Sequence, residues 1–352
     1  MPGATARLVL HADADSFFAS VALRARPELR EVPMAAVAHV FIASANYPAR
    51  ALGIRGGMST QDALRICPHL ALVEVPRAEI EEVGDALFDL FHECADAVEP
   101  GSIEEAFLDV GTGDRSRAVA AARSLRERAA RELGIPVSVG IGRTKLMAKV
   151  ASRAAKPDGL HVIGASEEAR LRETLPITEV WGVGGKTVQR LRDLGVQRLA
   201  DIDRLSEDRL SAACGTTMAR RLLGIRAGTD DAEVRPVEVR TTLASEGSIA
   251  GWARLDWTPL ELVESCIRRL CKRADRAGLV GAGITVSLTP ETDEAPIVLR
   301  RRIPDPTADV DAWLAVGREL LTARRTPPLT TIRVTLTGLQ PAATVEPTLF
   351  SF

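Results

Sequence analysis

The chain has 352 residues, 46% of them hydrophobic and 26% charged, and a formal net charge of −2, which is ordinary for a soluble protein of two or more domains. No apolar run reaches the about 20 residues of a membrane span, and the N-terminus lacks the basic and apolar regions of a signal peptide. Five cysteines without a C-x-x-C pair argue against a disulfide framework and predict a reduced, cytoplasmic protein. Because the net charge is small, any nucleic-acid contact has to rest on local basic patches.

Acidic pairs lie at two predicted strands that are far apart in the sequence. The hydrophobic run 7–12 leads into Asp13 and Asp15, and Glu104 and Glu105 lie within the β-forming stretch 101–109. Carboxylates in such a setting are costly unless positive charge lies on them. We therefore expect neighbouring strands of one sheet that hold divalent metal through oxygen ligands, with exposed acids at strand ends as the alternative.

The segments 11–21 and 102–109 resemble the first and second acidic motifs of Y-family (translesion) DNA polymerases, and further matches follow in order along nearly the whole chain. The resemblance is to the DNA polymerase IV (DinB) branch. It implies an α+β multidomain fold arranged as a right hand, with palm, fingers, helical thumb and a βαββαβ little-finger domain. It also implies two divalent ions, Mg²⁺ or Mn²⁺, held by Asp13, the carbonyl of Ala14, Glu104 and Glu105, of which the three acids are catalytic.

The same resemblance divides the chain into domains. The expected ranges are 1–16 and 76–165 for the palm, 17–75 for the fingers, 166–229 for the thumb, 230–240 for a polar linker, 241–340 for the little finger and 341–352 for a tail.

A helix is predicted to begin near Phe17, with Ser16 as its N-cap. Phe17 and Phe18 are adjacent, so they point in different directions on a helix, and one can be buried while the other faces a pocket. The resemblance assigns Phe18 as the steric gate that excludes a ribose 2′-OH and so predicts a preference for deoxynucleotides. The alternative is that both rings belong to the core.

Residues 43–50 match the triphosphate-binding segment of the family. Tyr47 and Arg50 are three residues apart, so one helical turn places them side by side. A phenol donor and a planar guanidinium suit a phosphate chain, and Ser44 adds a hydroxyl. The segment before it lacks glycines, which predicts a short loop in the fingers.

The second part of the palm is predicted from helical and strand patterns at 79–92, 116–133 and 135–142. Residues 144–159 match the palm helix of the family and its A-K-P-x-G end. Lys156 lies at that end, where the resemblance implies that its ammonium reaches the nucleotide phosphates. A solvated surface lysine is the alternative.

Residues 180–196 resemble a helix-hairpin-helix. Gly182 and Gly184 allow a tight turn, and the N–H groups at the start of the next helix can then bind a DNA phosphate. Lys186 and Thr187 add side-chain contacts.

The little finger is predicted to contain strands at 243–249, 283–289, 297–303 and 331–336 and helices at 260–277 and 310–321. Arg300 and Arg302 share one face of their strand because residues alternate across a strand. With Arg240 and Arg333 they are expected to grip template phosphates without reading sequence. A second basic group is expected on a solvated helix face; its members are Arg268, Arg269, Lys272, Arg273 and Arg276.

The tail 346–352 resembles the peptide that binds the bacterial sliding clamp, with Glu346 where Gln is preferred. Leu349 and Phe350 would fill the apolar clamp pocket, or else fold back onto their own domain. The expected partners are primer–template DNA, dNTP and the sliding clamp, with no membrane, and the protein is expected to be a monomer.

The family has Asp at the position of Glu104, so the extra methylene predicts activity that is slow, dependent on Mn²⁺ or lost. Two hypotheses follow. One is an active, low-fidelity, template-directed DNA polymerase in damage tolerance. The other is a weak or inactive relative that serves as an adaptor on the clamp. Retention of the carboxylates and the phosphate-binding set favours the polymerase.

Overall fold

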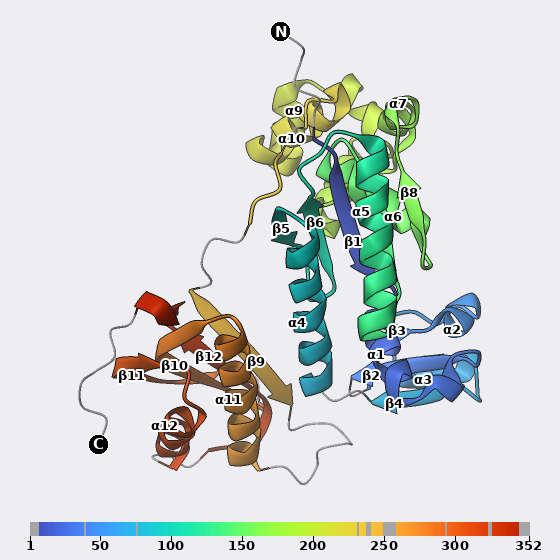
Figure 1. Cartoon of the computed structure of the whole chain (residues 1–352). Helices are drawn as coiled ribbons and strands as arrows, with labels where there is room; N and C mark the ends of the chain where they lie inside the picture. Colours follow the sequence, from blue (N-terminus) through green and yellow to red (C-terminus); the bar gives the residue numbers. More distant parts are fainter. Residues whose placement is uncertain are drawn as a thin grey trace. The chain divides into compact units, whose positions relative to one another are not determined.

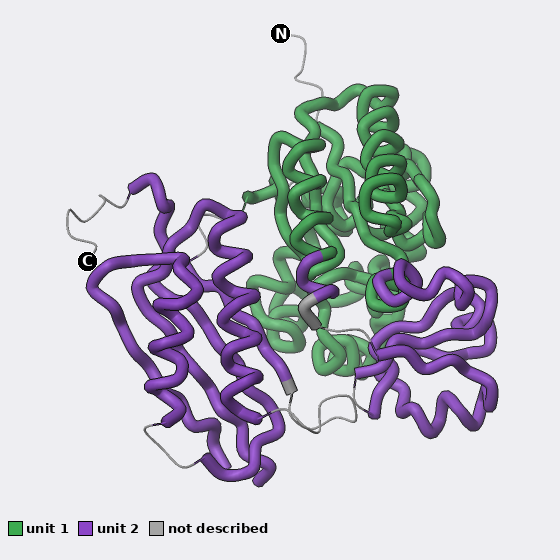
Figure 2. The backbone as a smooth tube through the Cα atoms, turned by 60° about the horizontal axis from the view of Figure 1, so that its bottom comes forward, with its two compact units in different colours: residues 1–20, 83–236 green, residues 21–82, 237–352 purple. Residues whose placement is uncertain are grey.

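The computed structural model describes residues 7–38, 40–74, 77–230, 232–236, 241–248, 258–292, 294–322 and 326–344 (Figure 1). Arg240 and the proposed clamp-binding residues Glu346, Leu349 and Phe350 lie outside these ranges. The chain divides into two compact units, residues 1–20 with 83–236 and residues 21–82 with 237–352 (Figure 2). Among the described helices, none combines the length and the apolar character needed to cross a membrane.

The first unit is built on a five-stranded sheet with the order β5-β6-β1-β7-β8. Strand β1 pairs antiparallel with both β6 and β7, and β8 runs parallel to β7. Both central strands are almost fully buried, as their apolar composition predicts. The strands are β1 (Val9–Ala14), β5 (Ala97–Pro100), β6 (Glu105–Asp109), β7 (Val137–Gly142) and β8 (Leu160–Val162).

Helix α6 (Lys145–Ala155) packs directly on this sheet because β7 carries two glycines beneath it. A Cβ on Gly140 would lie 2.0 Å from the backbone nitrogen of Ser152, and one on Gly142 would lie 2.7 Å from that of Ala148. Only glycine permits so close an approach. The helix starts at the N-cap Thr144, whose side chain accepts from the N–H of Met147.

The other helices around the sheet are α1 (Phe17–Ala25), α4 (Arg77–Cys94) and α5 (Arg115–Arg128), which continues as a π-helical turn to Leu133. The helices that sequence patterns predict at 79–92 and 116–133 are thereby confirmed. The prediction of a side-chain cap at Ser16 is wrong. Its backbone is left-handed with φ +47°, and its buried Oγ has no hydrogen-bond partner among the described residues.

Residues 165–227 form a helical region with its own core. Its helices are α7 (Ala165–Thr174), α8 (Gly185–Asp193), α9 (Glu207–Cys214) and α10 (Thr216–Ala227). Leu191, Ile202 and Leu222 are fully buried there and pack with Leu146 and Met147 of α6. The helical character expected for this stretch is confirmed.

The second unit begins with a small sheet of order β3-β2-β4. It consists of β2 (Met34–Ala38), β3 (Phe41–Ala45) and β4 (Ala71–Glu74), with α2 (Tyr47–Ala51) and α3 (Thr60–Ile66) packed on it. Only two residues join β2 to β3, so the loop is short, as predicted. Ile42, Ile54 and Ala63 fill its core.

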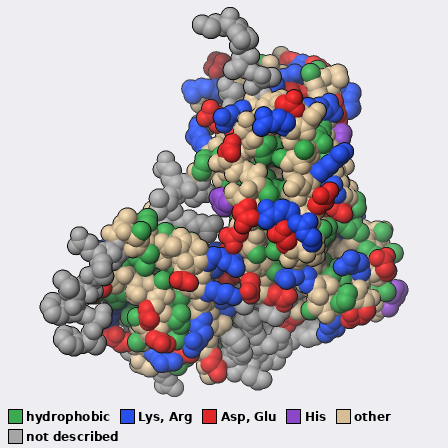
Figure 3. All heavy atoms as spheres, in the orientation of Figure 1, with side chains coloured by type: hydrophobic (Ala, Val, Ile, Leu, Met, Phe, Trp, Pro, Cys, Tyr) green, Lys and Arg blue, Asp and Glu red, His purple; other side chains and the backbone are tan. Residues whose placement is uncertain are grey.

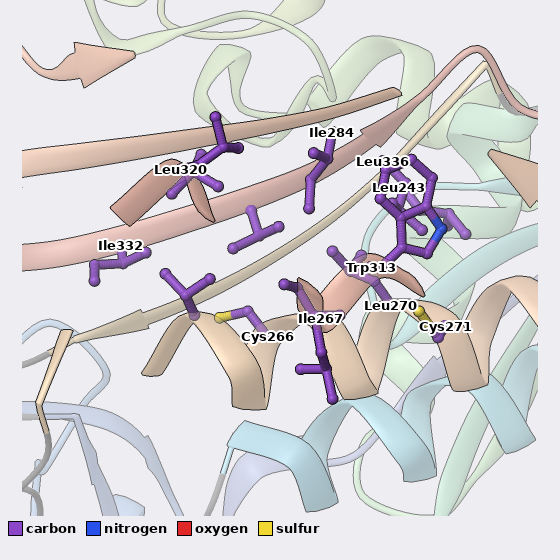
Figure 4. Close-up of a cluster of buried hydrophobic side chains, with 14 of the residues drawn as sticks. Leu243, Cys266, Ile267, Leu270, Cys271, Ile284, Trp313, Leu320, Ile332 and Leu336 are labelled. Carbon is purple, nitrogen blue, oxygen red and sulfur yellow. The ribbon is translucent and has the colours of Figure 1, made fainter. Parts of the chain in front are cut away.

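The C-terminal part of the second unit is a four-stranded sheet of order β11-β10-β12-β9 with helices on one face. Its elements are β9 (Thr242–Ser248), α11 (Pro259–Arg276), β10 (Leu279–Pro290), β11 (Ile297–Thr307), α12 (Val310–Thr322) and β12 (Leu329–Thr337), and the short β13 (Gln340–Pro341) pairs with β10. This is the predicted βαββαβ order. Trp313 is fully buried among Ile267, Leu270, Ile284 and Leu336 (Figure 4).

Among the basic residues of α11, Arg268, Lys272 and Arg276 are exposed, as predicted, whereas Arg273 is half-buried and Arg269 is buried. Arg269 is buried and lies 3.2 Å from Glu81, while Ser245 accepts from its Nε at 2.9 Å. Lys272 pairs with Glu82 at 2.9 Å. Arg269 thus has its charge paired within the unit, as a buried guanidinium must.

Candidate active site and nucleic-acid interface

The two acidic strands are neighbours, and their register places Asp13 directly opposite Glu105. Ligand atoms of His11, Asp13 and Glu105 all lie within 4.8 Å of one another, and within the described ranges no other group of three such residues meets that spacing. A Cβ on Gly101 would lie 2.8 Å from Oε1 of Glu105, so the glycine leaves room for this carboxylate. The structure therefore brings together two of the predicted acids and adds a histidine.

Glu104 lies outside this cluster. Strand β6 begins only at Glu105, and the residues before it form a bend. The carbonyl of Glu104 accepts from the N–H of Ala14 at 3.0 Å, and its own N–H donates to Oγ of Ser102 at 3.2 Å. The backbone of Glu104 is thus tied to the end of β1, next to Asp13.

Two lysines on one side of α6 supply the positive charge that the carboxylates need. Nζ of Lys149 lies 2.5 Å from Oε2 of Glu105, and Nζ of Lys156, just after the helix, lies 2.6 Å from Oδ1 of Asp13. The two lysines are seven residues apart, which is about two helical turns and returns to the same face. Because Lys156 had been identified from the sequence, this seven-residue spacing could have predicted Lys149 as a second lysine at the site.

His11 is fully buried beneath Lys149. Its Nδ1 lies 2.7 Å from Oγ of Ser152 and its Nε2 lies 3.3 Å from Nζ of Lys149. Its ring centre lies 4.7 Å from that of Phe107, with the two planes tilted by 59°. Sequence reasoning assigned no role to His11, Lys149 or Ser152.

The environment shifts two pKa values in this cluster. Burial lowers the pKa of His11 below its ordinary value. The pKa of Glu105 is lowered to about 2 by its contacts with His11 and then with Lys149, which outweigh burial. Glu105 is therefore ionised at any physiological pH.

This shift predicts a pH dependence of stability for the metal-free protein. The folded pKa of Glu105 lies below the unfolded value of 4.5, so its contribution is complete above about pH 4.5 and is lost as the pH falls toward 2. From pH 5 to pH 3 this group alone should lower the free energy of unfolding by about 2 kcal/mol. Denaturant unfolding of the wild type and of Glu105→Gln measures the difference; equal losses in both would contradict the assignment.

Asp15 is fully buried behind the cluster. Its Oδ2 accepts from Oγ of Ser138 at 2.8 Å and from the N–H of Asp158 at 2.6 Å. These bonds tie the end of β1 to β7 and to the segment after α6, so the geometry favours a structural role for this acid.

The donor set fits a divalent cation. Asp13 and Glu105 offer carboxylate oxygens at one place, and the carbonyl of Ala14 belongs to the same strand end. Two ammonium groups now balance these charges. Hard, negatively charged oxygen donors are the ligands that Mg²⁺ and Mn²⁺ prefer.

The two phenylalanines at the start of α1 diverge as predicted. Phe17 is 1% exposed and belongs to the core, whereas Phe18 is partly exposed and meets Phe17 edge-on at 5.8 Å. Phe18 is therefore the ring that can face a ligand.

The predicted phosphate-binding residues of the second unit cluster around α2. The guanidinium of Arg50 lies 5.4 Å from the ring centre of Tyr47, which confirms that the two are side by side, and its Nε donates to the carbonyl of Ala45. Ser44 is buried at the end of β3. Asn46, which sequence reasoning passed over, caps α2 and accepts from the N–H groups of Ala49 and Met34.

The predicted helix-hairpin-helix contains a sharp turn at Gly182, where φ is +85°. Helix α8 begins at its N-cap Gly184, and a Cβ on Gly184 or Gly185 would meet nothing within 4 Å. Internal packing does not require glycine there, so the absence of side chains leaves the helix start open to an external group. Lys186 is exposed and Thr187 partly exposed beside it.

The open face of the C-terminal sheet is polar. Arg300 and Arg302 pair across the ladder with Thr285 and Gly283, whereas Arg301 pairs with the buried Ile284 and contacts Glu319 of α12 at 2.5 Å. The prediction that two of the three arginines share a face is confirmed. Arg333 lies on the same open face but is paired with Glu246 at 2.7 Å.

Charge on the surface is mixed rather than of one sign. Lys and Arg side chains lie among Asp and Glu side chains over the face shown in Figure 3, in keeping with a net charge of −2. Any nucleic-acid contact would therefore rest on small groups of basic residues rather than on a large basic surface.

Comparison with protein families gives consecutive matches. Residues 12–153 match the impB/mucB/samB family, residues 160–196 match the IMS family HHH motif, and residues 258–349 match the impB/mucB/samB family C-terminal domain. The first segment contains Asp13, Glu105 and Lys149, whereas His11 and Lys156 lie just outside it.

Curated relatives carry the name DNA polymerase IV. The chain is 33% identical to the one from Akkermansia muciniphila, with 80% of each protein covered, and 35% identical to the one from Aeromonas hydrophila, with 79% of this chain and 82% of that protein covered. The relatives from Desulfatibacillum aliphaticivorans and Mesorhizobium japonicum are 36% and 37% identical, but the chain spans only 62% and 58% of their lengths.

Solved structures share the fold. An insertion ternary complex of Dbh DNA polymerase aligns with a TM-score of 0.68 and DinB from Sulfolobus solfataricus with 0.66. Both are 25% identical and cover 94% of this chain and 98% of theirs. The mixed α/β architecture with a separate C-terminal sheet, expected from the sequence, is confirmed.

Proposed function

The chain belongs to the impB/mucB/samB family, as a Y-family polymerase of the DinB type, and on that premise we propose that it is a template-directed DNA polymerase. It would add dNTPs to a primer 3′-OH with low fidelity, in translesion synthesis during DNA-damage tolerance, and so act as a mutator. The observation that carries this proposal is the register of Asp13 against Glu105 with Lys156 beside them.

The metal site of this proposal consists of Asp13, the carbonyl of Ala14, Glu104 and Glu105. Two divalent ions bound there would activate the primer hydroxyl and stabilise the charge that develops on the transferred phosphoryl group. Glu105 lies beside the ammonium group of Lys149 and Asp13 beside that of Lys156, so cations already occupy the places where positive charge is needed. Lys156, once released from Asp13, has a free ammonium for the phosphates of the nucleotide.

The nucleotide is bound, in this proposal, by Ser44, Tyr47, Arg50 and Lys156, with Phe18 as the steric gate against ribose. The stacked pair of Tyr47 and Arg50 offers a hydroxyl and a fork of N–H donors suited to the phosphate oxygens.

DNA binding is assigned to backbone contacts. The open start of α8, with Gly182, Gly184, Lys186 and Thr187, would hold a phosphate. The open face with Arg300, Arg302 and Arg333, together with Arg240, would hold further phosphates without reading sequence. The domains of this proposal keep the ranges expected from the sequence: palm 1–16 and 76–165, fingers 17–75, thumb 166–229 and little finger 241–340.

We also propose a monomeric, cytoplasmic protein that engages the bacterial sliding clamp through Glu346, Leu349 and Phe350. Substituting both Leu349 and Phe350 with Ala should abolish retention on an immobilised clamp and leave primer extension without clamp unchanged.

Primer extension tests the main proposal. The purified protein is incubated with a primer–template duplex and dNTPs in Mg²⁺ and, separately, in Mn²⁺, with Glu105→Ala as the inactive control. Template-dependent addition that is absent in the variant supports the polymerase. A lack of extension in both metals, with DNA or clamp still bound, refutes it and leaves the adaptor.

The glutamate at position 104 is expected to make the activity depend on Mn²⁺ rather than Mg²⁺. Replacing Glu104 with Asp should raise the rate in Mg²⁺ relative to Mn²⁺ by about 10- to 100-fold, because a misplacement of the order of 1 Å at a ligand costs that much. Single-nucleotide insertion rates in the two metals measure the ratio. Glu105→Asp serves as the control and should lower the rate in both; an unchanged ratio for Glu104→Asp would exclude Glu104 as the source of any Mn²⁺ preference.

Glu246 is expected to weaken DNA binding, because it forms an ion pair with Arg333 on the open face. Glu246→Gln frees one guanidinium, so binding should tighten and the slope of log K against log salt should steepen by about 0.9. Fluorescence anisotropy of a labelled duplex from about 50 to 200 mM salt measures the slope. Glu319→Gln, which frees Arg301 on the opposite face, is the matched control, and an equal effect of both variants would contradict the prediction.

A further inference from the structure

Lys149 contacts two side chains that could each ligate a metal ion, Glu105 and His11. Its Nζ lies 2.5 Å from Oε2 of Glu105 and 3.3 Å from Nε2 of His11. The side chain is only 15% exposed, so its position is set by the surrounding protein.

The Nδ1–H tautomer of neutral His11 satisfies its contacts with Ser152 and Lys149 together. Ser152 donates its hydroxyl to the carbonyl of Lys149 at 2.9 Å, so its Oγ accepts from Nδ1–H of His11 at 2.7 Å. An ammonium group is only a donor, so the contact between Lys149 and Nε2 requires a lone pair on Nε2. His11 is thus arranged as metal-binding histidines are, with one nitrogen donating to the protein and the other free to coordinate.

The spacing of the two acceptors also suits a metal. Nε2 of His11 lies 3.4 Å from Oε2 of Glu105, and two ligands about 2.1 Å from an ion at a tetrahedral angle lie about 3.4 Å apart. A ligand oxygen of Asp13 is within 4.8 Å of both. One imidazole and two carboxylates form a ligand set that favours zinc or another transition metal over Mg²⁺.

We propose that Lys149 is a metal-specificity residue of the active site. Its ammonium covers Nε2 of His11 and keeps the imidazole from coordinating, so that only oxygen ligands face the bound ions. Glu105 keeps Oε1 for coordination while Oε2 holds Lys149. His11 and Ser152 act as positioning residues, because they fix the direction in which Lys149 points. The proposal deepens the polymerase function and rests on it for the identity of the native ions.

Packing of α6 on β7 makes this arrangement rigid. The backbone of Ser152 lies against Gly140, opposite His11 in the ladder, so helix and strand approach to the limit that glycine allows. Lys149 and Ser152 are three residues apart and share the face that meets His11. The backbone positions from which Lys149 and Ser152 project are therefore fixed relative to His11.

The test is binding of Co²⁺ alone, without nucleotide or DNA, followed by visible absorption and calorimetry. Co²⁺ with an imidazole ligand in four- or five-fold coordination absorbs more strongly than octahedral Co²⁺ bound by oxygen. The wild type should bind weakly with a faint spectrum. Lys149→Leu, which removes the ammonium and adds no ligand atom, should bind about 10- to 100-fold tighter with the stronger spectrum.

Matched variants distinguish coordination by His11 from a non-specific effect of removing the positive charge of Lys149. Lys149→Arg keeps a cation and should behave as the wild type. Lys149→Leu with His11→Phe keeps a ring against Phe107 but has no imidazole, and should lose both the affinity and the spectrum. Lys149→Ala is judged by the same criteria if the leucine variant does not fold. An unchanged spectrum in the Leu or Ala variant, or its retention without His11, overturns the proposal.

The outcome is independent of the primer-extension result. A wild type that extends primers, with no imidazole signature in Lys149→Leu, refutes the role of Lys149 and leaves the polymerase intact. Absence of extension with the signature present refutes the polymerase and leaves Lys149 as the residue that masks His11.

Discussion

Replacing Glu105 with Gln should lower primer extension in Mg²⁺ by at least about 10³-fold. The change removes a charge that faces Asp13 across the strand pair and leaves the ammonium of Lys149 without its carboxylate. Both effects act where the proposed mechanism requires negative charge to hold cations. The measurement is kcat/KM for insertion of one correct dNTP, with circular dichroism to verify the fold.

Glu99→Gln is the matched control for this result. Glu99 also lies in the same sheet, on β5, and pairs with a lysine of α6, Lys145, at 2.5 Å. Its side chain is 23% exposed against 18% for Glu105. Loss of this pair should leave kcat/KM within about threefold, because Glu99 and Lys145 lie outside the Asp13–Glu105 cluster, and any cost falls on stability, since Lys145 is buried. If both variants lose activity equally, the effect of Glu105 is structural and the proposed role is wrong.

Replacing Phe18 with Ala should lower the preference for dNTP over rNTP by on the order of 100-fold. Phe18 is the partly exposed ring of the pair, and removing it opens space where a 2′-OH would lie if the ring is the steric gate. The quantity to measure is the ratio of kcat/KM for matched dNTP and rNTP. The rate with dNTP itself should fall less, because the catalytic groups are untouched.

Phe17→Leu separates a steric gate from a general disturbance of α1. Phe17 is 1% exposed, so this substitution is expected to cost about 1 kcal/mol of stability and to leave the sugar ratio unchanged. A ratio that changes in Phe17→Leu as much as in Phe18→Ala would show that helix α1, rather than the exposed ring, sets the preference.

Several features of this protein follow from its sequence alone, because they depend on local periodicity. Alternation on the predicted strand 297–303 places Arg300 and Arg302 on one face, and the register confirms it. Helical spacing predicts the contact of Tyr47 with Arg50. The elements of the βαββαβ order and the apolar strands that carry Asp13 and Glu105 were predictable for the same reason. The pattern of each single element is local in the sequence.

The tertiary structure alone decided which distant groups meet. The pairing of Lys149 with Glu105 and His11 depends on how α6 lies over β7, which two glycines allow and no local pattern encodes. Arg269 is buried and forms an ion pair with Glu81, which is 188 positions away in the chain. Its helical spacing contains no trace of that partner and therefore suggested a solvated face. The same holds for Glu104, adjacent to Glu105 in sequence but outside the cluster, because the strand begins only after it. Register and packing between remote segments are global properties, and they determine the chemistry of the site.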